Sequence, residues 1–247
     1  MGAAGSVVPG AAESLPPATP PPAGTSQLTH CAQLTSNCIS EEDGEILATK
    51  FLMAGSAFVE FIKQLGGFAG QSAGEVRKHL NSIMRAGAKR TLREVLADER
   101  ERLQAEARDP LTEYDTAAKG AVWVVRAMRY WEMVCSERLG IANGRLADPP
   151  SFERTLATAY EAIVKPFLAD DIIAQTAFEL AIKAAPPWDE IREKLVAVNG
   201  TEADFSADAK SFIPTISQFA TRLEDLLKDT YPQYETVGPK HGDNVVG

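Results

Sequence analysis

Apolar residues recur every three or four positions through most of residues 46–234, and a chain with this spacing buries its apolar surface along the faces of helices. Glycine- and proline-containing pairs separate the helical segments at Gly66-Gly67, Asp109-Pro110, Pro186-Pro187 and Asn199-Gly200. No alternating apolar run bounded by hairpin turns interrupts the pattern. The sequence therefore predicts an all-α domain of about eight helices.

The two ends of the chain differ in composition from the middle. Residues 1–40 contain six of the 15 prolines, no lysine or arginine, and a single acid, Glu13. Such a segment buries too little apolar surface to offset the conformational entropy lost on ordering. We therefore expect a disordered Pro/Ala/Gly-rich tail over residues 1–40, a folded domain over residues 41–235 and a short C-terminal tail over residues 236–247.

The first six residues, Met-Gly-Ala-Ala-Gly-Ser, match the pattern for myristoylation of Gly2. The pattern is permissive in a segment so rich in alanine and glycine, and an inert tail is the alternative. The segment has neither the apolar core of a secretory signal nor the arginines of a mitochondrial presequence. These features predict a cytoplasmic protein.

Charge and composition exclude several classes of function. The formal net charge is -9, from 25 basic and 34 acidic residues, which disfavours nucleic-acid binding. Three scattered cysteines do not form a metal or disulfide pattern, and Cys135 is expected in the core. His30 and His241 fall in the predicted tails, so neither can complete a catalytic triad in the domain. We expect no catalytic residues, no cofactor and no metal.

The central segment resembles the signature helix of the glycolipid transfer protein family. It runs from Ala117 through Trp123-Val-Val-Arg126-Ala-Met-Arg129-Tyr-Trp131, with an arginine three residues after a tryptophan. Other segments match family landmarks in the family's order: Phe61–Gly66, Thr91–Glu99, Ala159-Tyr160-Glu161, Ala184-Ala185-Pro186 and Phe212-Ile213-Pro214. No single motif is specific, but the combined order and spacing cover residues 46–234.

This resemblance implies a two-layer helical sandwich with a hydrophobic chamber for one sphingolipid. The acyl chains would lie between the layers and the headgroup in a shallow site at the mouth. Members of the family carry lipid between membranes without covalent chemistry. A chain of about 15 methylenes, each worth about 0.8 kcal/mol when buried, leaves a bilayer very slowly unless a protein shields it. We therefore expect a monomer that associates transiently with membranes and takes a sphingolipid or glycolipid ligand.

The resemblance also assigns headgroup residues on the segment that follows Gly66-Gly67. Glycolipid binders carry Asp, Asn and Lys there at positions i, i+4 and i+7, and this sequence has Glu75, His79 and Ser82. A carboxylate at Glu75 can accept hydrogen bonds from hydroxyl groups, and His79 can donate one. Ser82 lacks the family's cation. The alternatives are that Glu75 complements a helix dipole and that His79 is a solvated polar residue.

Two residues of the signature helix complete the implied site. Trp123 would stack against the first sugar ring, and Arg126 would orient the headgroup with its fixed fork of donors. An ordinary core tryptophan is the alternative for Trp123. Phosphate-binding relatives carry a second arginine four residues before Arg126, where this chain has Val122. That difference favours a glycolipid over a phosphosphingolipid, and Arg129 is expected to be solvated or structural.

The sequence departs from the family pattern near the sixth helix. The family's histidine, which bonds the ceramide amide carbonyl, is replaced by Leu168 or by Asp170, depending on the landmark from which the register is counted. In the first register the family's membrane-docking tryptophan becomes Asp170. The change leaves two alternatives to a carrier on the same fold: a lipid-sensing regulator, or a scaffold with an altered pocket.

Overall fold

The computed structural model describes residues 15–87, 89–113, 115–144, 150–168, 171–196 and 201–234. Over these residues the chain forms no β-sheet, only two isolated bridges. Its nine α-helices are α1 (Gln27–Ser36), α2 (Ala48–Gln64), α3 (Gly70–Arg85), α4 (Leu92–Ala105), α5 (Ala117–Ala142), α6 (Phe152–Ala159), α7 (Ile172–Lys183), α8 (Trp188–Leu195) and α9 (Glu202–Thr230). The predicted all-α class is confirmed, with one helix more than expected.

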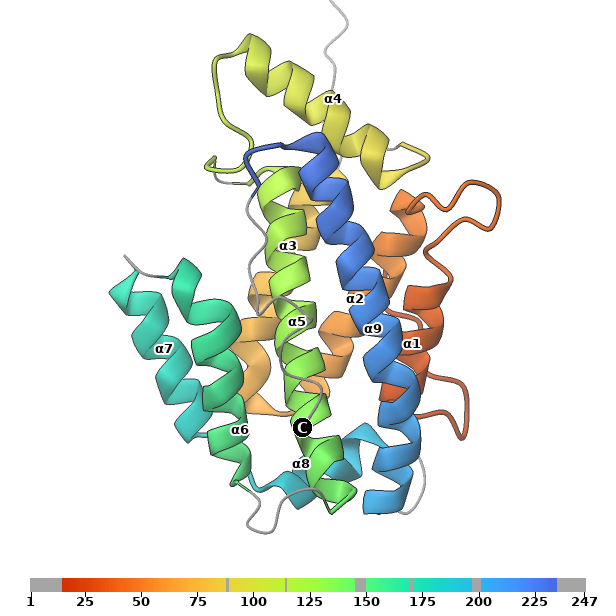
Figure 1. The fold of residues 1–247 in the computed structure, drawn as a ribbon, viewed down its shortest axis with the longest axis vertical. Helices are drawn as coiled ribbons and strands as arrows, with labels where there is room; N and C mark the ends of the chain where they lie inside the picture. The colour runs from red at the N-terminus through yellow and green to blue at the C-terminus, as the bar shows by residue number, and fades with distance from the viewer. Residues whose placement is uncertain are drawn as a thin grey trace, which may run out of the picture.

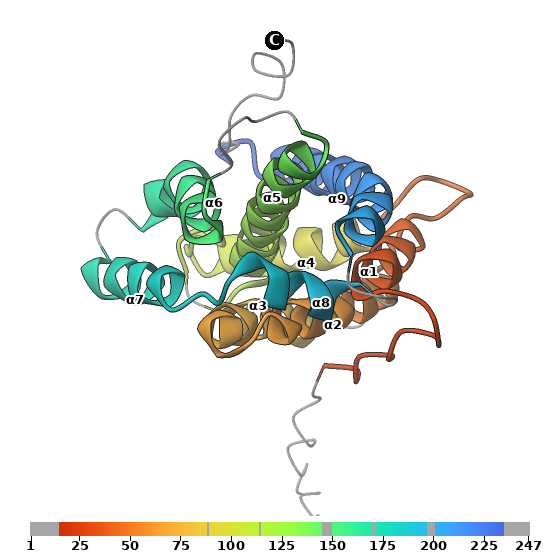
Figure 2. The ribbon, with the colours of Figure 1, turned by 90° about the horizontal axis from the view of Figure 1, so that it is seen from below.

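The helices form two layers, which Figure 2 shows end-on. One layer consists of α5, α6 and α9, and the other of α1, α2 and α3, with α7 beside α6 at the outer edge. Helices α4 and α8 lie at opposite ends of the sandwich (Figure 1). The predicted two-layer helical sandwich is therefore confirmed. No described helix has both the length and the apolar composition that a membrane span needs.

Aromatic side chains fill the space between the layers. Phe61 of α2 lies 5.5 Å from Trp131 of α5 and 5.6 Å from Phe212 of α9, measured between ring centroids. The rings of Phe51 and Phe219 are also stacked, with their centroids 6.0 Å apart. Burial of such side chains contributes about 1.5–3 kcal/mol each relative to exposure, so this cluster holds the two layers together.

The expectation of disorder over residues 1–40 is wrong for α1. Leu28, Cys31 and Ala32 are buried in the core, because their i, i+3, i+4 spacing gives α1 an apolar face that packs against α2 and α9. Ser26 caps the helix by accepting a hydrogen bond from the Thr29 amide at 3.0 Å. His30 is buried as well. Gly2 and His241 lie outside the described residues.

The long helix α5 is capped from α4. The buried Glu99 carboxylate accepts hydrogen bonds from the backbone amides of Ala117 at 2.7 Å and Ala118 at 2.9 Å. These amides begin α5 and would otherwise have no partner within the helix. A carboxylate at this position also complements the positive end of the helix dipole. The cap fixes where α5 starts, and with it the position of every side chain that α5 contributes to the site.

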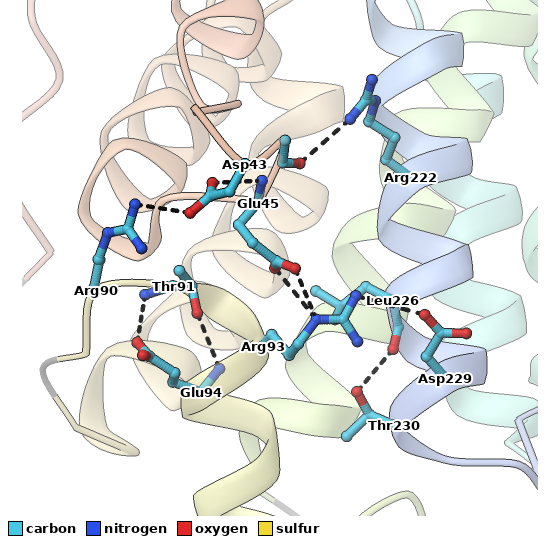
Figure 3. A network of polar contacts seen from close by, with 11 residues as sticks. Asp43, Glu45, Arg90, Thr91, Arg93, Glu94, Arg222, Leu226, Asp229 and Thr230 are labelled. Carbon is cyan, nitrogen blue, oxygen red and sulfur yellow. Dashed lines mark hydrogen bonds and ion pairs between the residues drawn. The ribbon is translucent and has the colours of Figure 1, made fainter. Parts of the chain in front are cut away.

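Figure 3 shows the polar contacts that attach the α1–α2 connection and the start of α4 to α9. Arg93 lies 3.0 Å from Glu45 and 3.5 Å from Asp229, and Arg90 lies 2.8 Å from Asp43. These pairs are exposed, so each contributes at most about 1 kcal/mol. The capping box of Thr91 with Glu94 starts α4 beside them.

Candidate functional site

A pocket of about 640 Å³ opens between α3, α5, α7 and the segment that extends α6. Its volume is within the roughly 300–1,000 Å³ typical of small-molecule sites. All four predicted headgroup residues line it: Glu75 and His79 from α3, and Trp123 and Arg126 from α5. Apolar side chains from α5, α7 and the α6 extension also line it: Val122, Ala127, Trp131, Val164, Phe178 and Ile182.

Close approach of α3 and α5 brings two of these side chains together. The imidazole of His79 and the indole of Trp123 are stacked, with centroids 5.8 Å apart and planes 7° from parallel. The approach depends on Gly120, where a Cβ atom would lie 2.6 Å from the His79 carbonyl oxygen. Any side chain at residue 120 would push α3 away from α5.

Arg126 lies between two aromatic rings. Its guanidinium carbon is 4.6 Å from the Trp123 centroid and 3.4 Å from the centroid of Phe167. Among the described residues, its buried Nε has no hydrogen-bond partner. The arginine is thus held by stacking, which leaves its donors available for a ligand.

Burial determines the charge of the site. Burial, with a smaller contribution from the neighbouring cations Lys78 and Lys119, lowers the pKa of the His79 imidazole to about 4. His79 is therefore neutral at pH 7, where it offers one donor and one acceptor instead of a charge. Burial also lowers the pKa of Arg126, to about 10, so its guanidinium stays protonated.

Sequence reasoning missed two lysines at the pocket. Lys78 is one turn from Glu75 on the same face of α3, and its Nζ lies 3.6 Å from a Glu75 carboxylate oxygen. Lys119 comes from the first turn of α5, and its Nζ donates to the Thr112 carbonyl at 3.2 Å. The i+3 relation of Lys78 to Glu75 was visible in the sequence. The position of Lys119 at the pocket depends on how α5 crosses α3, so it could not be predicted from the sequence.

Ser82 and Arg129 do not line this pocket. The buried Ser82 hydroxyl donates to the Lys78 carbonyl within α3 at 3.2 Å. Arg129 is only 9% exposed and pairs with Glu132 at 2.9 Å and with Glu224 at 2.8 Å. We expected Arg129 to be either solvated or structural. The solvated alternative is wrong, and Arg129 has a structural role. Its network fastens α5 to α9.

The α6 side of the pocket has an irregular backbone. A π-helical turn (Tyr160–Val164) and a 3₁₀ turn (Lys165–Phe167) follow α6, because Pro166 has no amide hydrogen with which to continue it. Leu168 then presents an apolar side chain to the pocket, and its carbonyl accepts a hydrogen bond from Gln175 Nε2 at 2.5 Å. Asp170, the other candidate for the family's histidine position, lies outside the described residues.

Comparison with known proteins identifies this arrangement. The model of the glycolipid transfer protein family matches residues 46–197, which is more than half of the chain. The chain belongs to the glycolipid transfer protein family. The match includes the whole of α3 and α5 and therefore Glu75, His79, Trp123 and Arg126, which line the pocket. A search of curated protein sequences finds no relative.

Solved structures share the fold at low sequence identity. A mutant of Arabidopsis accelerated-cell-death 11, complexed with a ceramide-1-phosphate, superposes with a TM-score of 0.68 at 15% identity, covering 83% of this chain and 97% of that one. Human ceramide-1-phosphate transfer protein gives 0.67 at 15% identity, with 83% and 97% covered. A fungal glycolipid transfer protein, HET-C2, gives 0.60 at 17% identity, with 77% and 90% covered. At these identities the likeness shows the fold alone.

Proposed function

We propose that this family member binds one sphingolipid at the α3–α5 pocket and transfers it between membranes without chemical change. The observation that carries the proposal is a cavity of about 640 Å³ that is lined by many apolar side chains and also by Glu75, His79, Trp123 and Arg126. Apolar walls suit acyl chains, and the few polar groups suit a headgroup. Burial of each methylene contributes about 0.8 kcal/mol to shielding the lipid from water.

We favour a sugar headgroup. Glu75 is an exposed carboxylate that can accept hydrogen bonds from two hydroxyl groups, and the neutral His79 can donate one. Trp123 offers an indole face in the same pocket, once the ligand displaces part of its contact with His79 or Arg126. Val122 leaves the phosphate-binding arginine pair of the family incomplete.

A phosphosphingolipid is the second candidate, and a specific observation supports it. Lys78, Lys119 and Arg126 bring three cationic side chains to the pocket, against the carboxylates of Glu75 and Asp171. Charge-assisted hydrogen bonds to phosphate are roughly twice as strong as neutral ones. Relatives of the same fold have been solved with ceramide-1-phosphate bound.

The open pocket argues against one of the two alternatives to a carrier, a scaffold with an altered pocket. A scaffold that had lost its ligand would be expected to fill the cavity with side chains, because unfilled apolar volume destabilises a fold. A lipid-sensing regulator remains compatible with the pocket, and it would hold its lipid without rapid exchange. We place the protein in the cytoplasm as a monomer that meets membranes transiently.

A vesicle-to-vesicle transfer assay tests the function and the headgroup together. Donor vesicles carry fluorescent galactosylceramide in one experiment and fluorescent ceramide-1-phosphate in the other, with unlabelled acceptors. The proposal predicts faster galactosylceramide transfer with protein than without it, and slower ceramide-1-phosphate transfer than galactosylceramide transfer. Faster phosphate-lipid transfer would favour the second candidate. Stable binding without transfer would favour the regulator.

A further inference from the structure

The segment that precedes α1, residues 15–24, crosses the outside of the layer formed by α1, α2 and α3 (Figure 2). It reads Leu-Pro-Pro-Ala-Thr-Pro-Pro-Pro-Ala-Gly, and residues 15–22 belong to no helix or β-bridge. Proline fixes its own φ angle and pushes the residue before it into extended backbone. Five of the eight residues 15–22 are prolines, so the sequence favours a polyproline II helix, which has three residues per turn.

Two buried side chains hold this segment by its backbone. Ser56 of α2 donates a hydrogen bond from its hydroxyl to the Pro16 carbonyl at 2.8 Å. His30 of α1 donates one from Nε2 to the Thr19 carbonyl at 2.9 Å. Ser56 and His30 are only 4% and 5% exposed, so both anchors are fixed in the packed domain. The two acceptors are three residues apart, which is one turn of a polyproline II helix.

Exposure of the side chains follows the same three-residue period. One edge of the segment is half-buried against the domain: Leu15, Ala18 and Pro21. Leu15 packs against the hydrophobic core. Another edge is exposed to solvent, and we call it the proline ridge: Pro17, Pro20 and Ala23. Because the domain holds a different edge, the ridge is fixed in place and open to a partner.

The composition of the segment selects the class of partner. Proline rings on a polyproline II helix dock in grooves lined by aromatic side chains, and the preformed helix loses little entropy on binding. Residues 15–24 contain no charged side chain, and residues 1–40 contain no lysine or arginine. A groove that requires a basic residue beside the prolines therefore finds none here. The partner has to recognise the segment by aromatic contacts with the prolines.

We propose that the proline ridge is the docking site for a partner protein whose proline-binding groove is aromatic and needs no basic residue in its ligand. The anchors at Pro16 and Thr19 favour binding, because they order the segment before the partner arrives. None of residues 15–24 lines the α3–α5 pocket. Partner and lipid can therefore bind at the same time, and the inference does not depend on the proposed function.

Titration of the full-length protein with purified WW, EVH1 and SH3 domains tests the ridge. The probes are WW and EVH1 domains that accept uncharged proline runs, and the negative controls are SH3 domains that require an arginine beside the prolines. At least one probe should bind wild type. Pro17→Ala/Pro20→Ala should bind that probe at least about tenfold more weakly, because the two rings that enter the groove are lost. Both prolines are exposed, so the thermal unfolding of this variant should stay close to that of wild type.

Pro20 and Pro21 provide a matched pair of single substitutions. Each alanine removes one proline and a similar backbone restraint, but Pro20 lies on the ridge and Pro21 on the half-buried edge. Pro20→Ala should weaken binding at least about fivefold, whereas Pro21→Ala should stay within about twofold of wild type.

Three outcomes would overturn the proposal. One is that no WW or EVH1 domain of the panel binds wild type. Another is that Pro21→Ala weakens binding as much as Pro20→Ala, which would show that the stiffness of the segment matters and the ridge does not. The third is preferential binding by the arginine-dependent SH3 domains, which would place the contact elsewhere on the chain.

A lipid titration separates this proposal from the lipid-carrier function. Saturation with the bound domain should leave the affinity for a short-chain galactosylceramide unchanged, because the ridge and the pocket share no residue. Loss of lipid binding on adding the domain would contradict docking at the ridge. A wild-type protein that binds the domain through the ridge but binds no sphingolipid would refute the proposed function and leave the ridge established.

Discussion

Gly120 lies directly against the backbone of His79, where an added Cβ atom would be 2.6 Å from the His79 carbonyl oxygen. The contact sets the spacing of α3 and α5, and thereby the stacking of His79 on Trp123. We expect Gly120→Ala to destabilise the fold by about 1–3 kcal/mol through overpacking and to weaken lipid binding. Urea unfolding and lipid titration would measure the two effects.

Gly74 provides the matched control for that substitution. It lies in α3 next to Glu75, but nothing lies within 4 Å of a Cβ atom placed there. Gly74→Ala should stabilise the protein by up to about 1 kcal/mol, because alanine favours the helix, and should leave lipid binding unchanged. Equal behaviour of the two alanine variants would contradict the role assigned to Gly120.

Trp123 supplies the aromatic platform in the proposed site. Trp123→Ala should reduce lipid pickup at least tenfold while the far-ultraviolet circular dichroism stays that of a folded helical protein, since the side chain is half-buried at the pocket and not in the central core. Trp123→Phe keeps an aromatic face and should retain part of the binding. Undiminished transfer by the alanine variant would refute the platform.

Glu75 is proposed to accept hydrogen bonds from headgroup hydroxyls. Glu75→Gln preserves the size of the side chain and should weaken galactosylceramide binding about tenfold, as expected for loss of a charge-assisted bond of about 1.5 kcal/mol. Ceramide-1-phosphate should bind no more weakly, because a negative charge is removed. Glu101→Gln on α4, also an exposed position, serves as the control. Equal losses for both lipids would count against the assignment.

The low pKa of His79 makes stability depend on pH. Its value is about 4 in the fold and 6.5 in the unfolded chain, so the unfolded chain takes up the proton first as pH falls. The stabilisation is complete above about pH 6.5 and is lost progressively from there towards pH 4. Between pH 7 and pH 5 the unfolding free energy should fall by about 1–2 kcal/mol more in wild type than in His79→Asn. Parallel pH profiles would contradict the burial of a neutral imidazole.

The buried Arg129 network predicts a stability effect outside the pocket. Arg129→Ala leaves Glu132 and Glu224 without their cation and should cost about 3–5 kcal/mol. Replacing all three residues with apolar ones of similar size should restore most of that stability, since no buried charge then lacks a partner. Thermal unfolding measures both variants. An alanine variant as stable as wild type would show that the network contributes little.

Much of the fold was predictable because it depends on local periodicity. The helical segments and their glycine and proline boundaries follow from spacing alone, as at Pro166. Helix α1 was missed because the average composition of residues 1–40 concealed the short apolar stripe of Leu28, Cys31 and Ala32. A composition average over forty residues cannot detect a ten-residue helix that is stabilised by its neighbours.

The site was predictable only in part. The i, i+4 spacing of Glu75 and His79 placed both on one face of α3, and both line the pocket. Ser82 was assigned to the same face but is turned into the helix backbone. The neutrality of His79 and the stacking of Phe167 on Arg126 depend on how α3, α5 and the α6 extension meet. Such tertiary relations have no signature in the spacing of residues.

Native mass spectrometry of the full-length protein after incubation with mixed vesicles tests the central claim most directly. The account predicts one sphingolipid retained per protein chain, with a glycosphingolipid favoured, and its loss in Trp123→Ala. A correctly folded wild-type protein that retains no sphingolipid from such vesicles would contradict the account.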